Sequence, residues 1–245
     1  MKTMIMMAAT VAIAGSASAT VVTQWTFEGD TLAPATGSGT ATNIGGTTAS
    51  YASGNGGGRA WNTTSYQAQQ FGSGVAGVQF LVSTNSPSGG FGDIRVTFEH
   101  RASGTASRWA QVDYTLDGGS TWVSGFWNNN GGLSPHDTFY SFTVDFSSIT
   151  GANNNAGFGF RIVSIFSPLA FDQSSSLGPY QANAAYMRAN SGAVYSPNTS
   201  NASGDYGVSG TWRFDNVTIN GTAIPAPGAI ALLGAAGLVG TRRRR

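Results

Sequence analysis

Hydrophobic and polar residues alternate with a period of two along much of the chain between residues 20 and 222, a pattern that predicts β-strands. The alternation is clearest in segments 93–99, 108–116 and 158–163, where every second residue is apolar. Sustained apolar spacing of 3.6 residues is not found in this region, so no helix is expected. About eight to eleven short strands joined by turns predict an all-β fold, either an antiparallel two-sheet sandwich or a barrel, and we favour the sandwich.

Other parts of the body carry weaker strand patterns. Further strands are expected in segments 21–28, 66–71, 77–82, 121–126, 140–146 and 211–220. Segments 66–71 and 77–82 are expected to pair across Gly72-Ser73-Gly74. Segment 31–58 has few large apolar residues, and we interpret it as a long loop holding at most one poor strand. The irregular stretch 167–205 contains two short candidates, at 180–185 and 193–195.

The amino-terminal end has the pattern of a secretory signal peptide. Lys2 supplies a positive start, residues 4–14 are apolar, and Ala17-Ser18-Ala19 is an A-x-A cleavage site before Thr20. The apolar core is too short for a transmembrane helix. We therefore assign residues 1–19 to a signal peptide and begin the folded domain, residues 20–222, after it.

The carboxy-terminal end, residues 223–245, combines a Pro-x-Pro element, an apolar run and a basic tail. The apolar run, 228–240, is shorter than the roughly 20 residues of a permanent span, and an arginine cluster after it holds that end in the cytoplasm. The residues that define the two flanking elements are Pro225, Ala226, Pro227, Arg242, Arg243, Arg244 and Arg245. This order is that of a C-terminal sorting signal, and a plain tail anchor is the alternative.

The same order resembles the PEP-CTERM class of sorting signals, whose pattern is Pro-Glu-Pro, an apolar helix and an arginine cluster. Here Ala226 replaces the glutamate. The resemblance implies an exosortase-like transpeptidase and the secretion machinery as partners, with a transient membrane span before processing. It also implies delivery to the cell surface or the extracellular matrix.

The region between the two signals is acidic and lacks cysteine. Five of the twelve basic residues lie in the end segments and all eleven acids lie between them, so its net charge is 7 − 11 = −4. Binding to nucleic acid or to an acidic membrane surface is therefore not expected. Without cysteine there is no disulfide framework, and the domain depends on its core, with a bound metal as a further source of stability.

The body resembles, more loosely, the jelly-roll domains of secreted surface proteins and carbohydrate-binding modules. The resemblance rests on Trp25-Thr-Phe-Glu28 and on Trp212-Arg-Phe-Asp-Asn-Val217. It implies that the first and last strands are neighbours in one sheet, with a structural calcium ion held by Glu28 and Asp215. We add Asp30 to this candidate site, because calcium takes six to eight oxygen ligands. The alternative is that these acids are solvated strand ends or partners of an arginine.

The aromatic Trp109 is expected on an outward strand face, opposite the row that begins with Ala110. Three polar side chains share that orientation: Gln111, Asp113 and Arg161. If this face is exposed, Trp109 can stack on a sugar ring while the polar groups bind its hydroxyls. A second candidate platform is formed by Trp122, Phe126 and Trp127. The alternative is that all these aromatic residues are packed.

The segment Thr115-Leu-Asp117-Gly-Gly119-Ser-Thr121-Trp122 fits the Asp-box pattern of sialidase-like hairpins. Only one copy is present, so we interpret it as a stable hairpin in which Asp117 accepts backbone N–H bonds and Gly119 takes a positive φ. Patterns typical of catalysis are lacking, since neither GxSxG nor HExxH occurs.

The leading hypothesis is thus a secreted, non-enzymatic cell-surface or matrix protein. The alternative is a module that binds envelope or environmental polysaccharide, and a glycan-active hydrolase is the less favoured third.

Overall fold

The computed structural model describes residues 18–68, 72–129, 133, 136–166, 189 and 206–226. Most of the predicted signal peptide, the C-terminal apolar run and the two candidate strands within 167–205 lie outside these residues. In the part of the chain that is described, no helix is long and apolar enough to cross a membrane.

The described residues form eleven strands and one short 3-10 helix, which confirms the all-β prediction. The strands are β1 (Ala19–Trp25), β2 (Thr40–Ile44), β3 (Thr48–Ser53), β4 (Arg59–Thr64), β5 (Gly77–Leu81), β6 (Phe91–Ala102), β7 (Ala110–Thr115), β8 (Val123–Asn128), β9 (Tyr140–Asp145), β10 (Gly159–Ser164) and β11 (Trp212–Ala223), and the 3-10 helix is η1 (Thr150–Ala152).

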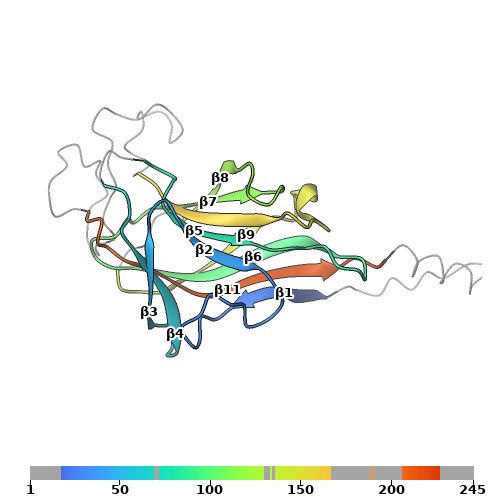
Figure 1. The fold of residues 1–245 in the computed structure, drawn as a ribbon, viewed down its shortest axis with the longest axis horizontal. Coiled ribbons are helices and arrows are strands. Elements are labelled where there is room, and N and C mark those ends of the chain that lie inside the picture. The colour runs from blue at the N-terminus through green and yellow to red at the C-terminus, as the bar shows by residue number, and fades with distance from the viewer. Residues whose placement is uncertain are drawn as a thin grey trace, which may run out of the picture.

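The strands are arranged in two antiparallel sheets, which Figure 1 shows as two layers. Sheet A has the order β3-β4-β11-β6-β9, and β1 also pairs with β11. Sheet B has the order β2-β5-β10-β7-β8. The pairing of β1 with β11 runs from Ala19 opposite Thr222 to Trp25 opposite Val217. The expectation that the first and last strands are neighbours is therefore confirmed.

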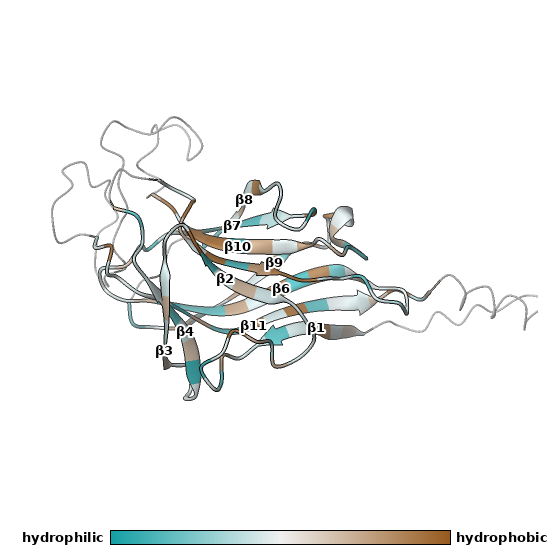
Figure 2. Ribbon diagram, in the orientation of Figure 1, coloured by the Kyte–Doolittle hydropathy of each residue, from teal (hydrophilic) through white to brown (hydrophobic). Residues whose placement is uncertain are grey.

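The hydrophobic core lies between the two sheets and is rich in aromatic rings. Phe80 of β5 stacks on Phe160 of β10, with ring centroids 4.9 Å apart. Trp61 reaches from sheet A and meets Phe80 edge-on at 5.9 Å, so the two layers interlock. The predicted inward rows are confirmed in β6, in 158–162 and in the first half of β7 by the buried side chains of Ile94, Val96, Phe98, Ala110, Val112, Phe158, Phe160 and Ile162. Tyr114 and Leu116, which continue the β7 row, are only partly buried. Figure 2 shows apolar and polar segments alternating along these strands, as burial of one face requires.

Two predictions about the first third of the body are wrong. Segment 31–58 is not a long loop with one poor strand, because it contains both β2 and β3. Ala41 of β2 enters the core, and the backbone of β2 pairs with β5 along its whole length. Small residues suffice here because the neighbouring strand supplies the hydrogen bonds and the bulky side chains.

The expected hairpin between segments 66–71 and 77–82 does not form. β5 pairs with β2 and β10 instead, so both of its edges are occupied. Tyr66 lies beyond the end of β4, where its ring packs on Trp212 at 4.9 Å and its hydroxyl bonds to Thr63. Tyr66 therefore packs against the core rather than taking part in a hairpin. β4, which was not predicted, occupies the place beside β11.

Candidate functional site

The outward face of sheet B is organised around one ion pair. Arg161 of β10 lies directly between Asp113 of β7 and Gln79 of β5 in the strand register. Its Nε donates to Asp113 Oδ2 at 2.8 Å. The other oxygen, Oδ1, accepts from Gln111 Nε2 at 2.7 Å and from the backbone N–H of Gly125 at 2.9 Å. Asp113 is 0% exposed. The expectation that Asp113 binds a ligand directly is therefore wrong, and its carboxylate holds Arg161 in place.

The hairpin between β7 and β8 carries an indole onto this ion pair. Asp117 accepts from the hydroxyl of Thr121 at 2.6 Å and from its backbone N–H at 2.9 Å. The Thr121 side chain and backbone, with the Thr115 hydroxyl, lower the pKa of Asp117 to about 2. Gly119 has a φ of +94° and its carbonyl accepts from Trp122 Nε1 at 3.1 Å. The Arg161 guanidinium carbon then lies 4.7 Å from the centroid of the Trp122 ring, within range of a cation–π contact.

Trp109 is placed differently from its expected role as an open platform. It precedes β7 at the end of the outward face and packs with Val163, Ile165 and Ile44. It is only 8% exposed, so little of its ring is free for stacking. The structure thus keeps Gln111 and Arg161 together with Asp113 but removes Trp109 from the candidate site.

The three residues of the second predicted platform do not lie on one face of the sheet. Phe126 stacks on Phe146 at 4.7 Å, and Trp127 meets Phe98 edge-on at 6.1 Å, so both belong to the core side. Trp122 is half-buried and lies on the outward face instead. Sequence reasoning named Trp122 but did not join it to Arg161, because this contact depends on how the hairpin folds back over sheet B.

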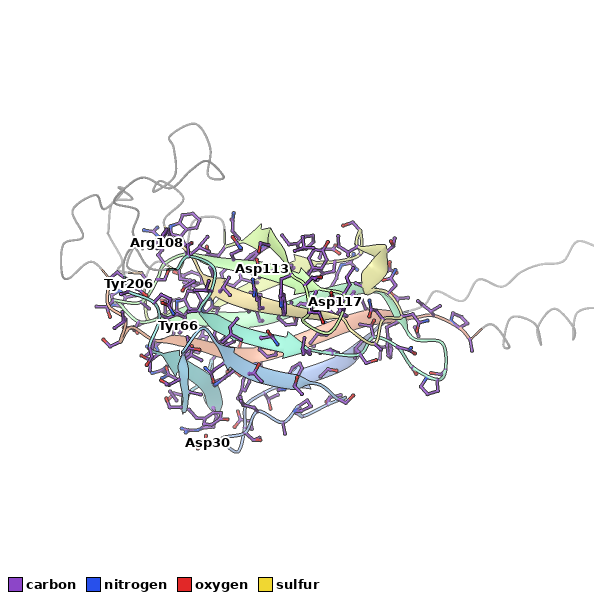
Figure 3. All side chains as sticks on the ribbon, turned by 45° about the horizontal axis from the view of Figure 1, so that its top comes forward. Asp30, Tyr66, Arg108, Asp113, Asp117 and Tyr206 are labelled. Atoms are coloured by element: carbon purple, nitrogen blue, oxygen red, sulfur yellow. The ribbon has the colours of Figure 1, made fainter. Side chains whose placement is uncertain are left out.

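This face combines an aromatic ring with polar groups and an ion pair whose two charges balance. Gln79 and Trp122 both approach Gly119, each with atoms within 3.9 Å of the point where a Cβ on that glycine would lie. Gln111 is half-buried on the other side of Arg161. Figure 3 shows Asp113 and Asp117 together on the sheet that faces the viewer, with Asp30 at the far edge. Such a surface can stack on an apolar ring face and bind hydroxyl groups around it.

A second cluster surrounds the loop between β3 and β4. Glu28 Oε1 accepts from the backbone N–H of Arg59 at 2.9 Å. Asp215 Oδ2 accepts from the backbone N–H of Asn55, also at 2.9 Å, and Oδ1 accepts from that of Asn216 at 2.8 Å. Burial raises the pKa of Asp215, and the negative charges of Glu99 and Glu28 raise it further. Two of the three acids predicted to converge therefore contact the same loop.

Asp30, the third predicted acid, does not join this cluster. It forms a two-pronged ion pair with Arg59, as the alternative of an arginine partner anticipated. Sequence reasoning missed Glu99, whose carboxylate accepts from the side-chain amides of Asn55 and Asn216 at 2.9 Å each. Glu99 lies opposite Asp215 across the β6–β11 pair, so knowledge of that pairing would have identified it.

The oxygen atoms at this loop suit an oxygen-liganded cation. The described residues contain no group of three or more His, Cys, Asp or Glu side chains that could hold a metal. Calcium, however, also uses backbone carbonyls. Asp215 Oδ2 and the carbonyls of Gly57 and Arg59 all lie within 2.9 Å of the point where a Cβ on Gly54 would be. These three oxygen atoms surround a small space beside Gly54, which a larger side chain at that position would fill.

Backbone strain occurs beside both carboxylates of this cluster. Phe27, which precedes Glu28, has a φ of +58°, and Asn216, which follows Asp215, has a φ of +46°. A bulky residue such as phenylalanine rarely adopts this conformation, which costs about 1–3 kcal/mol. Strain of this kind persists where the surroundings fix the position of a neighbouring group.

Three of the predicted processing residues lie where β1 begins and β11 ends. Ala19 opens β1, and Pro225 and Ala226 follow β11. The backbone at Ile224 donates to Gly90 O at 2.9 Å, which holds this segment against the turn before β6. The remaining predicted processing residues, Ala17, Pro227, Arg242, Arg243, Arg244 and Arg245, lie outside the described residues.

Comparison with known proteins gives structural similarities only. No family model matches the chain, and no curated protein matches it in sequence. Among solved structures, the chain is similar to the tandem CBM22-1–CBM22-2 domain of Paenibacillus barcinonensis Xyn10C, with 12% identity, a TM-score of 0.48 and coverage of 83% of this chain. This chain spans half of the length of that structure.

Two single modules are similar at a comparable level. The CBM22-2 xylan-binding domain of the same protein has 12% identity and a TM-score of 0.43, and the match covers 81% of this chain and 98% of that one. The family 11 carbohydrate-binding module of Clostridium thermocellum, in complex with a β-1,3-1,4-mixed-linked tetrasaccharide, has 10% identity and a TM-score of 0.39, covering 84% and 100%. Similarity this distant does not define the function of this chain.

Proposed function

We propose that this protein binds uncharged polysaccharide, without catalysis, through the outward face of sheet B. The observation that carries the proposal is the half-buried Trp122 ring held over Arg161. Asp113 neutralises Arg161, so the charged side chain that contacts the ring adds no net charge to this surface. This favours the carbohydrate-binding alternative of the sequence analysis over a purely structural matrix role.

The geometry supports binding because the site is fixed before a ligand arrives. Asp117 anchors the hairpin, Gly119 holds the indole N–H, and the buried carboxylate of Asp113 fixes Arg161. A rigid aromatic platform loses little conformational freedom on binding, so more of the contact energy remains as affinity. Gln79 and Gln111 offer amide donors and acceptors on either side of it.

Replacing Trp122 by alanine is expected to weaken polysaccharide binding about tenfold or more, because loss of about 1.4 kcal/mol of ring contact has that effect. Isothermal titration calorimetry with soluble xylan and mixed-linked β-glucan would measure it. The matched control is Val123→Ala at the adjacent exposed residue, which should bind like the unchanged protein. Equal affinities of the Trp122→Ala and Val123→Ala variants would exclude this face as the binding site.

We also propose that the domain is a jelly-roll-like sandwich carried to the cell surface or extracellular matrix between the two end signals. The Pro225-Ala-Pro227 motif and the arginine tail support a transient membrane span and processing by an exosortase-like transpeptidase. Intact-mass measurement of the exported protein would test both ends. A mass that retains residues 1–19 or the arginine tail would contradict the corresponding step.

A structural calcium ion is the further proposal for the loop between β3 and β4. Glu28, Asp215 and the carbonyls of Gly57 and Arg59 would hold it, and it would join β1, β11 and the loop. At 100-fold excess over its dissociation constant, the ion would add about 2.7 kcal/mol of stability. For a domain of this size, we then expect chelator to lower the melting temperature by roughly 5–10 °C.

Two variants separate this effect from general loss of stability. Asp215→Asn should abolish the difference in melting temperature between calcium and chelator. Asp30→Asn should retain it, because Asp30 is engaged with Arg59. An unchanged protein that melts at the same temperature in both conditions would rule the ion out.

A further inference from the structure

Two arginines lie directly opposite each other on the outward face of sheet A. Arg213 of β11 pairs in register with Arg101 of β6. Their neighbours on the same face are also polar, with Asn62 of β4 opposite Arg213 on its other side. Like charges placed directly across a sheet destabilise it unless something compensates them. The arrangement therefore raises the question of what balances the two positive charges.

Only one of these two charges has an acidic partner in the described part of the chain. Arg101 is paired with Asp137. Other arginines are paired in the same way, as Arg59 with Asp30, Arg95 with Asp145 and Arg161 with Asp113. Arg213 instead donates to two neutral oxygens, Asn62 Oδ1 at 3.3 Å and Ser53 O at 3.1 Å. Its guanidinium therefore has no carboxylate partner among the residues that the structure describes.

The Arg213 guanidinium retains donors that the described residues do not satisfy. Guanidinium has five N–H groups, of which the two contacts above use two. Burial lowers the pKa of Arg213 and the positive charge of Arg101 lowers it further, whereas the negative charge of Asp137 raises it. Arginine nevertheless remains charged in proteins. Two neighbouring guanidinium groups thus share the single carboxylate of Asp137, and this excess of positive charge is a favourable place for a further anion.

We propose that Arg213, together with Arg101, binds a carboxylate group of an acidic polysaccharide. The planar guanidinium group of an arginine can donate two parallel hydrogen bonds to the two oxygens of a carboxylate. Such charge-assisted bonds are about twice as strong as hydrogen bonds between neutral groups. That the carboxylate belongs to a polysaccharide rests on the proposed function, whereas the anion site itself rests on the two arginines. The site lies on sheet A, whereas Trp122 lies on sheet B, so one domain would hold two chains of different charge.

Acidic residues on the same face limit where the anion can lie. Glu99 and Asp215 form the next outward pair along β6 and β11, and their oxygens are engaged by Asn55 and Asn216. Asp137 lies on the other side, bonded to Arg101 and 3.4 Å from His136 Nε2. Acids thus flank the Arg213–Arg101 pair on both sides, which suits a single carboxylate rather than a long anionic track.

The test uses the full-length protein and two forms of one polymer, polygalacturonate and the same polymer with its carboxyl groups reduced. We expect the protein to bind polygalacturonate with an affinity that falls as salt is added. The affinity for the carboxyl-reduced polymer should be lower. Arg213→Gln should weaken polygalacturonate binding about tenfold, the loss expected when one charge-assisted contact is removed. The matched control is Arg95→Gln, which removes the same charge from the same sheet and should change affinity less than about twofold.

A variant that binds more tightly distinguishes a change at the site from a general loss of folding. Asp137→Asn removes the negative charge beside the pair, so it should tighten polygalacturonate binding several-fold, which misfolding cannot imitate. Trp122→Ala should leave this binding unchanged while weakening that of neutral polymers. Equal loss in Arg213→Gln and Arg95→Gln, no gain in Asp137→Asn, or equal binding of the carboxyl-reduced polymer would overturn the proposal. Preference for a sulfated polymer over polygalacturonate would overturn the carboxylate assignment.

Discussion

Replacing Asp113 by alanine is expected to lower the free energy of unfolding by about 3–5 kcal/mol, because it leaves a buried ion pair with one member. Asp113 is fully buried and accepts bonds from Gln111, Gly125 and Arg161. After the substitution, the partly buried Arg161 guanidinium loses its compensating charge, and two further donors lose their acceptor. Urea unfolding followed by fluorescence would measure the change.

Two further variants give this prediction its controls. Asp145→Ala removes a partner of Arg95 from a pair in which both side chains are about half exposed, and should cost less than about 1 kcal/mol. Replacing Asp113 and Arg161 together by apolar residues should recover much of the loss, since no unpaired charge remains. A cost for Asp113→Ala as small as that of Asp145→Ala would show that the pair does not organise sheet B.

Replacing His100 by phenylalanine is expected to remove most of the acid sensitivity of the fold between about pH 6.5 and pH 4. His100 is fully buried, and neither ring nitrogen has a hydrogen-bond partner within the described structure. Its ring stacks on Phe214 and meets Trp212 edge-on, each at 4.6 Å. Burial lowers the pKa of His100 from 6.5 to about 3.

The sign of the pH effect follows from this depressed pKa. Between pH 6.5 and about 3 the unfolded chain binds a proton at His100 that the folded protein does not bind. Stability is therefore complete above pH 6.5 and falls as the pH decreases, by up to about 1.4 kcal/mol per pH unit. In His100→Phe this slope should disappear. The phenylalanine ring should pack against Trp212 and Phe214 as the imidazole does, without burying an unpaired nitrogen.

Melting temperatures measured at intervals from pH 7 to pH 4 would test this prediction. His136→Gln serves as the control, because it removes the other histidine of the chain from a partly exposed position. Asp117 and Asp145 also have lowered pKa values, but their contribution is lost only as the pH falls below about 4. The same slope in His100→Phe and the unchanged protein would show that another group controls acid unfolding.

The strands with bulky alternating residues were predictable, and those with small residues were not. Ile94, Val96 and Phe98 mark β6 unambiguously, because only one face of that strand can be buried. β2 and β3 lack such a row, and their state is decided by neighbours distant in sequence. Thr47, between them, donates to Gly77 O at 2.9 Å, a contact that no local pattern reveals. Tertiary pairing overrides weak local preference in such segments.

The candidate site on sheet B was predicted in part. The alternation placed Gln111, Asp113 and Arg161 on one face, but it could not show that Asp113 is buried beneath the other two. Nor could it show that the indole over Arg161 comes from the hairpin, as Trp122, rather than from the strand, as Trp109. Period-two patterns give the side of a sheet, whereas exposure depends on which loops fold back over it.

The central position of β11 has a mechanical consequence. β11 is hydrogen-bonded to β6 along nearly its whole length, and to β4 and β1 on its other side. Tension on its C-terminal end, where the predicted sorting segment follows, acts along the strand and strains these bonds together in shear. Pulling Thr20 away from Gly221 would instead open the β1–β11 pair one bond at a time, from the shared end that Figure 1 shows. A domain tethered through β11 would thus resist force best when its bound polymer, rather than its other chain end, is pulled.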